Sequence, residues 1–127
     1  MATNIIESKA APAPIGPYSQ AVMAGNTLYV SGQIPLDQAT GQLVQGDIQA
    51  ETHQVMKNLQ YILEEAGMGF QHVVKCSIFV KDLGNFAAIN ETYGSYFSAN
   101  EPARETVEVS RLPKDVNVEI SCIAVKF

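Results

Sequence analysis

The stretch VNVEISCIAV, residues Val116–Val125, alternates between two kinds of side chain and decides the fold. One set is uniformly apolar: Val118, Ile120, Cys122 and Ala124. The other set is mixed: Asn117, Glu119, Ser121, Ile123 and Val125. A period of two predicts a β-strand whose apolar set is covered by helices. The mixed set is less polar than a solvent-facing surface, so we expect further copies of the chain to cover it. A monomer with an unusually apolar sheet face is the alternative.

Two segments have the spacing of amphipathic helices. The first runs from Asp47, which can cap its start, to Ala66, and Gly67 ends it in the left-handed conformation. The second covers residues 85–98. Its apolar stripe is typical of a core face and consists of Phe86, Ile89, Tyr93 and Phe97.

Strands are predicted around these helices, together with an extended proline-rich arm and a loop. They are a hairpin turning at Ala24-Gly25-Asn26 with Leu28 and Val30 on one face, strands at 72–80, 106–111 and 116–125, a short strand at 4–7, the arm Lys9–Tyr18 and the loop Asp37–Gly46. The order β-β-α-β-α-β-β predicts one α+β domain over residues 1–127. We expect one mixed, mainly antiparallel sheet with two helices on one face.

The length and composition fit one soluble domain. With 127 residues, of which 46% are hydrophobic, the chain can bury a core without disulfides or metals. The net charge of −5 argues against a nucleic-acid partner but leaves room for a small anion held by one arginine. Cys76 and Cys122 lie in apolar strand patterns and are predicted to be free buried thiols. We find no signal-peptide or membrane-spanning pattern and expect a cytosolic protein.

Arg104 stands at the start of a valine-alternating strand, in EPARETVEVSRLP (Glu101–Pro113). We place Val107 on the core side of that strand, which puts Arg104 and Thr106 on the other side. By the same alternation, Glu119 of the last strand lies on that side too. The pattern leaves two roles open: Arg104 and Glu119 form a salt bridge, or Arg104 binds a ligand carboxylate while Glu119 moves protons.

Several motifs resemble, in order, the Rid family of reactive imine and enamine deaminases, also called YjgF-type proteins. They are APAPIGPYSQA (11–21), VSGQIPLD (30–37), FVKDL (79–83), INETYGSYF (89–97), PARETVEVSRLPKDV (102–116) and VEISCIAV (118–125). The likeness is greatest to the archetypal deaminase subgroup, because Arg104 and Glu119 are both present. It implies a chorismate-mutase-like α+β fold and a homotrimer with the sheets inside, the helices outside and three sites in clefts between subunits.

The resemblance also implies a reaction. This is the hydrolysis of 2-aminoacrylate, 2-aminocrotonate and related 2-imino acids, released by pyridoxal-phosphate enzymes, to 2-oxo acids and ammonia. Such a 2-iminobutanoate/2-iminopropanoate deaminase serves metabolite damage control. Arg104 is implied to bind the substrate carboxylate, and Glu119 to activate water and return a proton to the leaving nitrogen. No cofactor, metal, nucleic acid or membrane is implied.

The resemblance assigns pocket positions to Tyr18, Ser31, Gly32 and Asn90, with the Gly32 main-chain N–H as a donor. From pattern alone, Tyr18 is an interface aromatic residue and Asn90 bonds a loop. Thr106 is a departure, since many relatives have cysteine there. Because the implied contact at this position is through the main chain, the departure bears on rate and substrate preference rather than on reaction class.

Two other functions remain open at this stage. A ribonuclease can use an Arg/Glu pair, but the acidic charge argues against it. A regulatory or chaperone-like trimer that only binds small carboxylates needs Arg104 but not Glu119. On a half-apolar strand face, we expect burial to raise the pKa of Glu119 and Arg104 to counter that rise.

Overall fold

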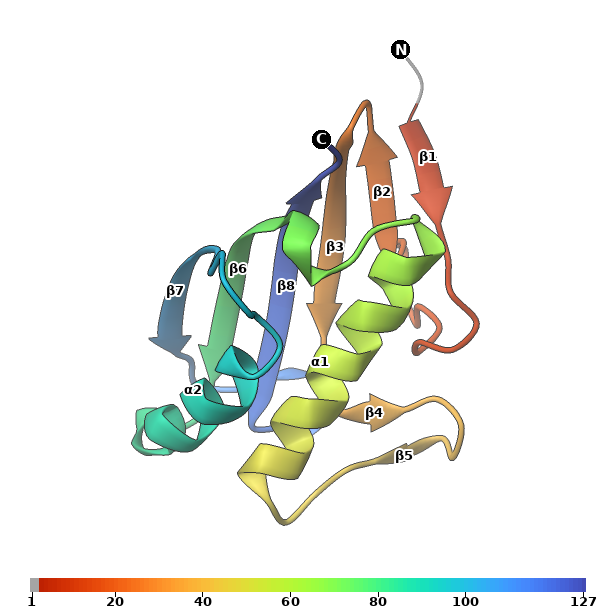
Figure 1. The fold of residues 1–127 in the computed structure, drawn as a ribbon. Coiled ribbons are helices and arrows are strands. Elements are labelled where there is room, and N and C mark those ends of the chain that lie inside the picture. Colours follow the sequence, from red (N-terminus) through yellow and green to blue (C-terminus); the bar gives the residue numbers. More distant parts are fainter. Residues whose placement is uncertain (1–2) are drawn as a thin grey trace.

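The computed structural model describes residues 3–127, and two helices lie on one face of a six-stranded sheet, as predicted (Figure 1). The strands of this sheet are β1 (Thr3–Ile6), β2 (Ala21–Ala24), β3 (Thr27–Gln33), β6 (Val73–Val80), β7 (Ala103–Glu108) and β8 (Val118–Val125). Their order is β1-β2-β3-β8-β6-β7, with β6 and β7 parallel and all other neighbours antiparallel. The last strand of the chain is therefore central, and β7 is an edge strand.

The predicted loop at residues 37–46 instead carries a small ribbon. Its strands are β4 (Leu36–Asp37) and β5 (Gln42–Leu43), which pair antiparallel outside the main sheet. Strands of two residues are too short to show an alternating pattern, so no local signal predicts them. Three short 3₁₀ turns complete the chain: η1 (Phe70–His72), η2 (Leu83–Asn85) and η3 (Pro113–Asp115).

The first helix, α1 (Ile48–Glu65), lies where its spacing predicts. The Asp47 side chain accepts a hydrogen bond from the Gln49 main-chain N–H at 3.0 Å, and Gly67 follows the helix with φ 73°. The apolar face of α1 packs on β3 and β8 and is fully buried: Val55, Met56, Leu59, Ile62 and Leu63. Burial of this face holds both central strands under one helix.

The second helix, α2 (Phe86–Gly94), is shorter than predicted. After Gly94, the chain continues through tighter turns, in which the N–H of Phe97 donates to the Gly94 carbonyl at 3.1 Å. Glycine is a poor helix former, which explains the early end. Ile89, Tyr93 and Phe97 are buried as predicted, but Phe86 is 41% exposed and does not belong to the core.

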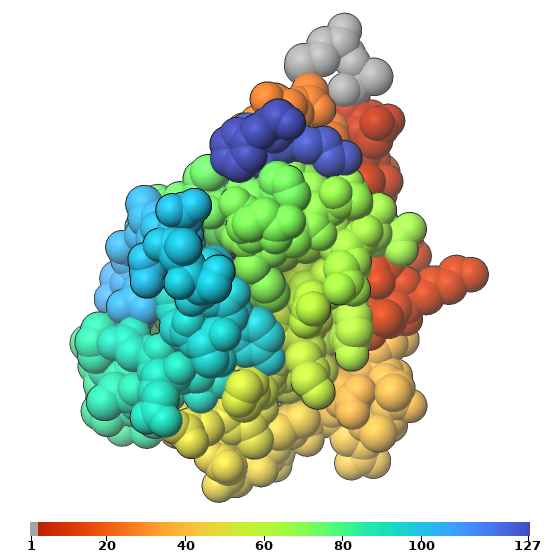
Figure 2. Space-filling model, viewed as in Figure 1, coloured from red at the N-terminus to blue at the C-terminus, as the bar shows by residue number. Residues whose placement is uncertain are grey.

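The two faces of the sheet differ in the way that β8 predicts. Val118, Ile120, Cys122 and Ala124 are buried beneath the helices. Figure 2 shows that side, where α1 and α2 hide most of the central strands. The opposite face, called here the open face, carries half-buried Glu119, Ser121, Ile123 and Val125 of β8. No helix of residues 3–127 is both long and apolar enough to cross a membrane.

The predicted parity of β7 was wrong. Cys76 of β6 stands opposite both Arg104 and the buried Cys122, so Arg104 lies on the helix side. Val107 stands opposite Phe79, on the open face, and is 40% exposed. Because apolar side chains occur on both faces, alternation in β7 alone does not reveal which face is covered.

Candidate functional site

Arg104 is held between β7 and α2. Its Nη1 donates to Asn90 Oδ1 at 2.7 Å, and its guanidinium carbon lies 5.1 Å from the Tyr93 ring centroid and 5.6 Å from that of Phe86. Both rings and Asn90 belong to α2. Cation–π contacts and a charge-assisted bond fix the plane of the guanidinium while leaving most of its donors free.

No carboxylate of residues 3–127 pairs with Arg104. The ion pairs in this part of the chain are Lys75–Glu105 at 3.1 Å and Lys81–Asp115 at 2.7 Å. Asn90 therefore bonds the arginine rather than a loop. A half-buried cation that is oriented but not neutralised is suited to an anionic ligand.

Glu119 lies on the open face, opposite Phe79 of β6. Its side chain forms no hydrogen bond or ion pair with any described residue, and burial raises its pKa above the ordinary value. The predicted counter-effect of Arg104 is absent within one chain. Glu119 is thus a carboxylate with raised proton affinity, as a general base near neutral pH requires.

The absence of a side chain at Gly32 leaves room for the Glu119 carboxylate. A Cβ at Gly32 would overlap that carboxylate, with the Glu119 Cδ only 2.8 Å away. The pairing of β3 with β8 shifts register between Val30 and Gln33, so Ser31 and Gly32 lie at an irregularity of the ladder. The glycine is therefore required for the position of Glu119.

The proline-rich arm is fastened beside Glu119 by Gln20, a side chain that is 2% exposed. Gln20 Oε1 accepts from the Ser8 N–H at 2.7 Å, and its Nε2 donates to the Pro12 carbonyl at 2.8 Å. Ser31 ties β3 to the same arm, donating through its hydroxyl to the Ser19 carbonyl at 2.6 Å. These bonds hold Tyr18, which is 52% exposed, near β3.

A cavity of about 360 Å³ lies beside Glu119 and Gly32. It is lined by Ile15, Tyr18, Ser31, Gly32, Ile34, Pro113, Lys114 and Glu119. A partly apolar lining with one carboxylate and one lysine suits a small polar ligand. Sequence reasoning missed Ile15, Ile34, Pro113 and Lys114, because loop and arm residues carry no periodic signal.

The predicted gathering of Arg104, Thr106 and Glu119 on one face is not observed. Arg104 and Thr106 lie on the helix side, level with Cys76 and Ile78, whereas Glu119 lies on the open face. The salt-bridge alternative is thereby excluded within one chain, since the sheet lies between the two charges. The Thr106 hydroxyl is buried with no hydrogen-bond partner among residues 3–127.

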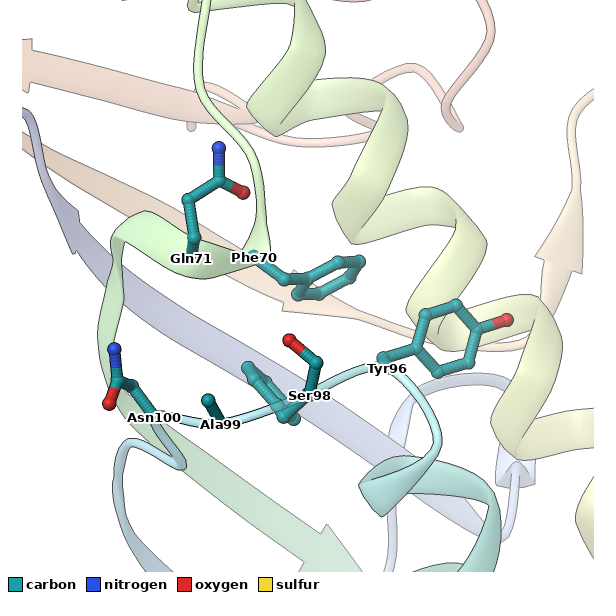
Figure 3. Close-up of a pocket in the computed structure, with 7 residues that line it drawn as sticks. Phe70, Gln71, Tyr96, Ser98, Ala99 and Asn100 are labelled. Carbon is teal, nitrogen blue, oxygen red and sulfur yellow. The ribbon is translucent and has the colours of Figure 1, made fainter.

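A second, smaller cavity of about 140 Å³ lies between η1 and the segment after α2 (Figure 3). Its lining is Phe70, Gln71, Tyr96, Phe97, Ser98, Ala99 and Asn100. The Phe70 and Tyr96 rings approach to 5.3 Å between centroids. The lining contains no side chain that is charged at neutral pH, so this cavity offers little to an anionic ligand.

The two cysteines are free and buried, as predicted. Cys76 and Cys122 stand opposite each other on β6 and β8, on the helix side of the sheet. Burial raises the pKa of both thiols, which makes them poor nucleophiles.

The arrangement defines a class of α+β protein with an oriented arginine on one side of a sheet and an unpaired glutamate beside a cavity on the other. Residues 8–126 match the family model described as Endoribonuclease L-PSP. A RutC family protein of Pyrococcus abyssi is 52% identical over 126 residues, covering 99% of each chain. The chain belongs to this family, also known as the Rid or YjgF family.

Solved structures agree with this assignment. A Rid family protein of Yersinia pestis, YyfA, is 47% identical with a TM-score of 0.96, covering 98% of this chain and 100% of its own. Escherichia coli TdcF, solved with bound serine, is 41% identical with a TM-score of 0.94, covering 98% of this chain and 99% of its own.

Proposed function

We propose that this protein hydrolyses reactive 2-imino and enamine acids to 2-oxo acids and ammonia, in sites formed between copies of the chain. One observation carries the proposal: Arg104 and Glu119, each without an ionic partner in residues 3–127, lie on opposite faces of one sheet. The two side chains can act on one small ligand when they come from two subunits.

Apolar residues support this assembly. At the β7 edge of the sheet, Leu83 of η2 and Phe86 beside Arg104 are exposed, and Val107 of β7 is exposed on the open face. Beside Glu119, the exposed Ile15 and Tyr18 line the cavity. A homotrimer, as the family resemblance implies, buries both sets of exposed apolar residues if the β7 edge of one subunit meets the open face of the next.

In the proposed site, one subunit supplies Arg104 and its neighbour supplies Glu119. The guanidinium binds the substrate carboxylate as a planar fork, while Asn90 and the two rings keep it from turning. Main-chain groups of the edge strand near Thr106 add hydrogen bonds, and Tyr18 and Gly32 of the neighbour bound the other side of the substrate. This orientation places the imine carbon near Glu119.

The chemical step needs one water and no change in oxidation state. Glu119 accepts a proton as the water oxygen bonds to the imine carbon, giving a carbinolamine. Glu119 passes that proton to the nitrogen and then accepts the proton of the carbinolamine hydroxyl as the carbon–nitrogen bond breaks, so that ammonia and a 2-oxo acid leave. An enamine such as 2-aminoacrylate first takes a proton at its terminal carbon and then follows the same path.

The family comparisons support the reaction class. Membership of the Rid family supports a general role in the deamination of reactive intermediates. Serine, the molecule bound in the TdcF structure, carries the same α-carboxylate as 2-aminoacrylate. We propose 2-aminoacrylate and 2-aminocrotonate as substrates, which yield pyruvate and 2-oxobutanoate.

The alternative enzyme activity is that of a ribonuclease, because the matching family model is described as Endoribonuclease L-PSP. The net charge of −5 gives an RNA backbone little to bind, and Arg104 is stacked on α2 rather than displayed in a basic groove. Incubation of RNA with wild type and with the Arg104 and Glu119 variants tests this rival, and cleavage at a rate unaffected by either substitution assigns the nuclease activity to another site or protein.

The test is a coupled assay. A threonine dehydratase generates 2-aminocrotonate in the presence of semicarbazide, which traps the free imine, and 2-oxobutanoate formation is followed with and without this protein. Wild type is expected to accelerate 2-oxobutanoate formation, whereas Arg104→Ala and Glu119→Gln are not. A wild-type protein that leaves the rate unchanged, but binds 2-oxobutanoate, supports the non-catalytic binder instead.

A further inference from the structure

The turn between β7 and β8 has an unusual backbone. Lys114 and Asp115, which belong to η3, both have positive φ, at 55° and 57°. Neither is glycine, and each such conformation costs about 1–3 kcal/mol for an ordinary residue. The fold therefore holds this turn against a local preference for other conformations.

Contacts on both sides hold the turn in place. Lys81 Nζ binds Asp115 Oδ1 at 2.7 Å, and Asn117 Nδ2 donates to both carboxylate oxygens of buried Glu51 at 3.1 Å. The side chains of Leu112 and Val116 are buried at the two ends. None of these contacts uses the Lys114 side chain, so the turn is fixed while that side chain stays available.

Lys114 lines the cavity that contains Glu119, Tyr18 and Gly32. It forms no ion pair with any carboxylate of residues 3–127. Burial raises the pKa of Glu119, and no ion pair joins its carboxylate to the Lys114 ammonium. Lys114 thus adds an unpaired positive charge to the cavity. Glu119 is the one carboxylate among the residues that line it.

We infer that Lys114 recruits anionic substrates into the Glu119 cavity. The inference rests on the proposed function for the identity of the substrate, a 2-imino acid with a free carboxylate. Arg104 of the neighbouring subunit makes the final bidentate contact, and Lys114 raises the local concentration of carboxylates before that contact forms. Such a role is electrostatic, so it weakens as salt screens the charge.

The experiment measures binding of 2-oxobutanoate, the stable product, by calorimetry at about 10 mM and about 300 mM NaCl. Three variants accompany wild type. Lys114→Asn removes the charge with a residue that tolerates positive φ, and Lys114→Arg keeps the charge. Lys57→Met removes an exposed lysine of α1 that lines none of the cavities described above.

The expected result is a dissociation constant about fivefold weaker for Lys114→Asn at low salt, and within about twofold of wild type at high salt. Lys114→Arg and Lys57→Met are expected to bind like wild type. Equal affinity of Lys114→Asn and wild type at low salt, or no binding by wild type, overturns the inference. A Lys114-dependent affinity in a protein that fails the dehydratase-coupled assay upholds the inference and rejects the deaminase.

Discussion

The charged residues on the two faces of the sheet differ in their polar contacts. On the helix side, Arg104 is bonded to Asn90 and stacked on Tyr93, so its position is set before any ligand arrives. On the open face, Glu119 touches Gly32 and makes no polar contact with the described residues. One face supplies an oriented cation, and the other supplies a base whose proton affinity depends on burial.

This difference keeps the two charged groups of the proposed reaction apart within one chain. If the two groups met within a subunit, they would form an ion pair, which holds a carboxylate ionised and lowers its basicity. Separation by the sheet keeps both free. In the proposed assembly, the two groups meet across a subunit interface, where substrate rather than Glu119 binds the guanidinium.

The largest effect on activity is expected from substituting Arg104 and Glu119 in separate variants and then mixing the two variants. Arg104→Ala and Glu119→Gln should each reduce kcat/KM by about 10²-fold or more, because each removes a charge-assisted contact or the base. Refolding a mixture of the two variants should restore about a quarter of the wild-type sites, since random trimers pair an intact Arg104 with an intact Glu119 at that frequency.

Activity of the mixture is measured beside each variant refolded alone, with the oligomeric state checked by light scattering. A mixture no more active than its parts, in trimers shown by mass spectrometry to contain both variants, rules out a site shared between subunits.

A smaller but still large effect is expected from Gly32→Ala. The new methyl group must push the Glu119 carboxylate aside, and a misplacement of about 1 Å can cost about 10²-fold in rate. Gly94→Ala is the matched control, because nothing lies within 4 Å of a Cβ at that position. Both variants should keep the wild-type circular dichroism spectrum, and equal kcat values for the two would show that Glu119 has no fixed catalytic position.

Two glutamates of the open face should respond to pH with opposite signs. Burial raises the pKa of Glu119, so its ionised form destabilises the fold as pH rises above 4.5. Glu105 accepts a hydrogen bond from Ser77 and pairs with Lys75, which lower its pKa, so its ionised form stabilises the fold above its folded pKa.

Glu119→Gln should therefore raise the free energy of unfolding at pH 7 and lose that advantage at acid pH, where wild-type Glu119 is protonated. Glu105→Gln should lower the free energy of unfolding at pH 7 and not at acid pH. Urea titrations at fixed protein concentration measure both, and a stabilising effect of equal size at both pH values would mean that the charge of Glu119 is not the cause.

The smallest effect concerns Thr106, whose buried hydroxyl lacks a partner in residues 3–127. Thr106→Val keeps the shape and removes an unpaired polar group, so it should stabilise the fold by about 1 kcal/mol. Thr52→Val is the control, because the Thr52 hydroxyl donates to the Ile48 carbonyl at 2.8 Å and its loss brings no gain. Thermal unfolding compares the two, and a stability loss in Thr106→Val would point to a partner supplied by another subunit.

Most elements of the fold could be predicted from local sequence. The alternation of β8 and the 3.6-residue period of α1 identify their buried faces, because period and burial are linked within a single element. Asp47 and Gly67 mark the limits of α1 for the same local reason. The two-residue strands β4 and β5 escaped prediction because they have no period.

Less of the site could be predicted. The residue types of Arg104 and Glu119 left open both a salt bridge and a carboxylate receptor with a base, and only the family resemblance favoured the second. Stacking of Arg104 on Phe86 and Tyr93 was missed, since a stripe of aromatic residues in a helix is ordinarily core. The close approach of Gly32 to Glu119 joins β3 to β8, and no local pattern reports such a contact.

Local sequence was sufficient for the order and type of the main strands and helices, and for the covered face and the half-apolar face of β8, but not for the end of α2 or the bounds of β7, which spans Ala103–Glu108 rather than 106–111. The side of the sheet on which Arg104 lies could not be found from local sequence. Its side follows from the pairing of β7 with β6, in which Arg104 stands opposite Cys76. A shift of one residue in that register would turn Arg104 to the open face, because successive side chains of a strand point in opposite directions and pairing alone sets which face they reach.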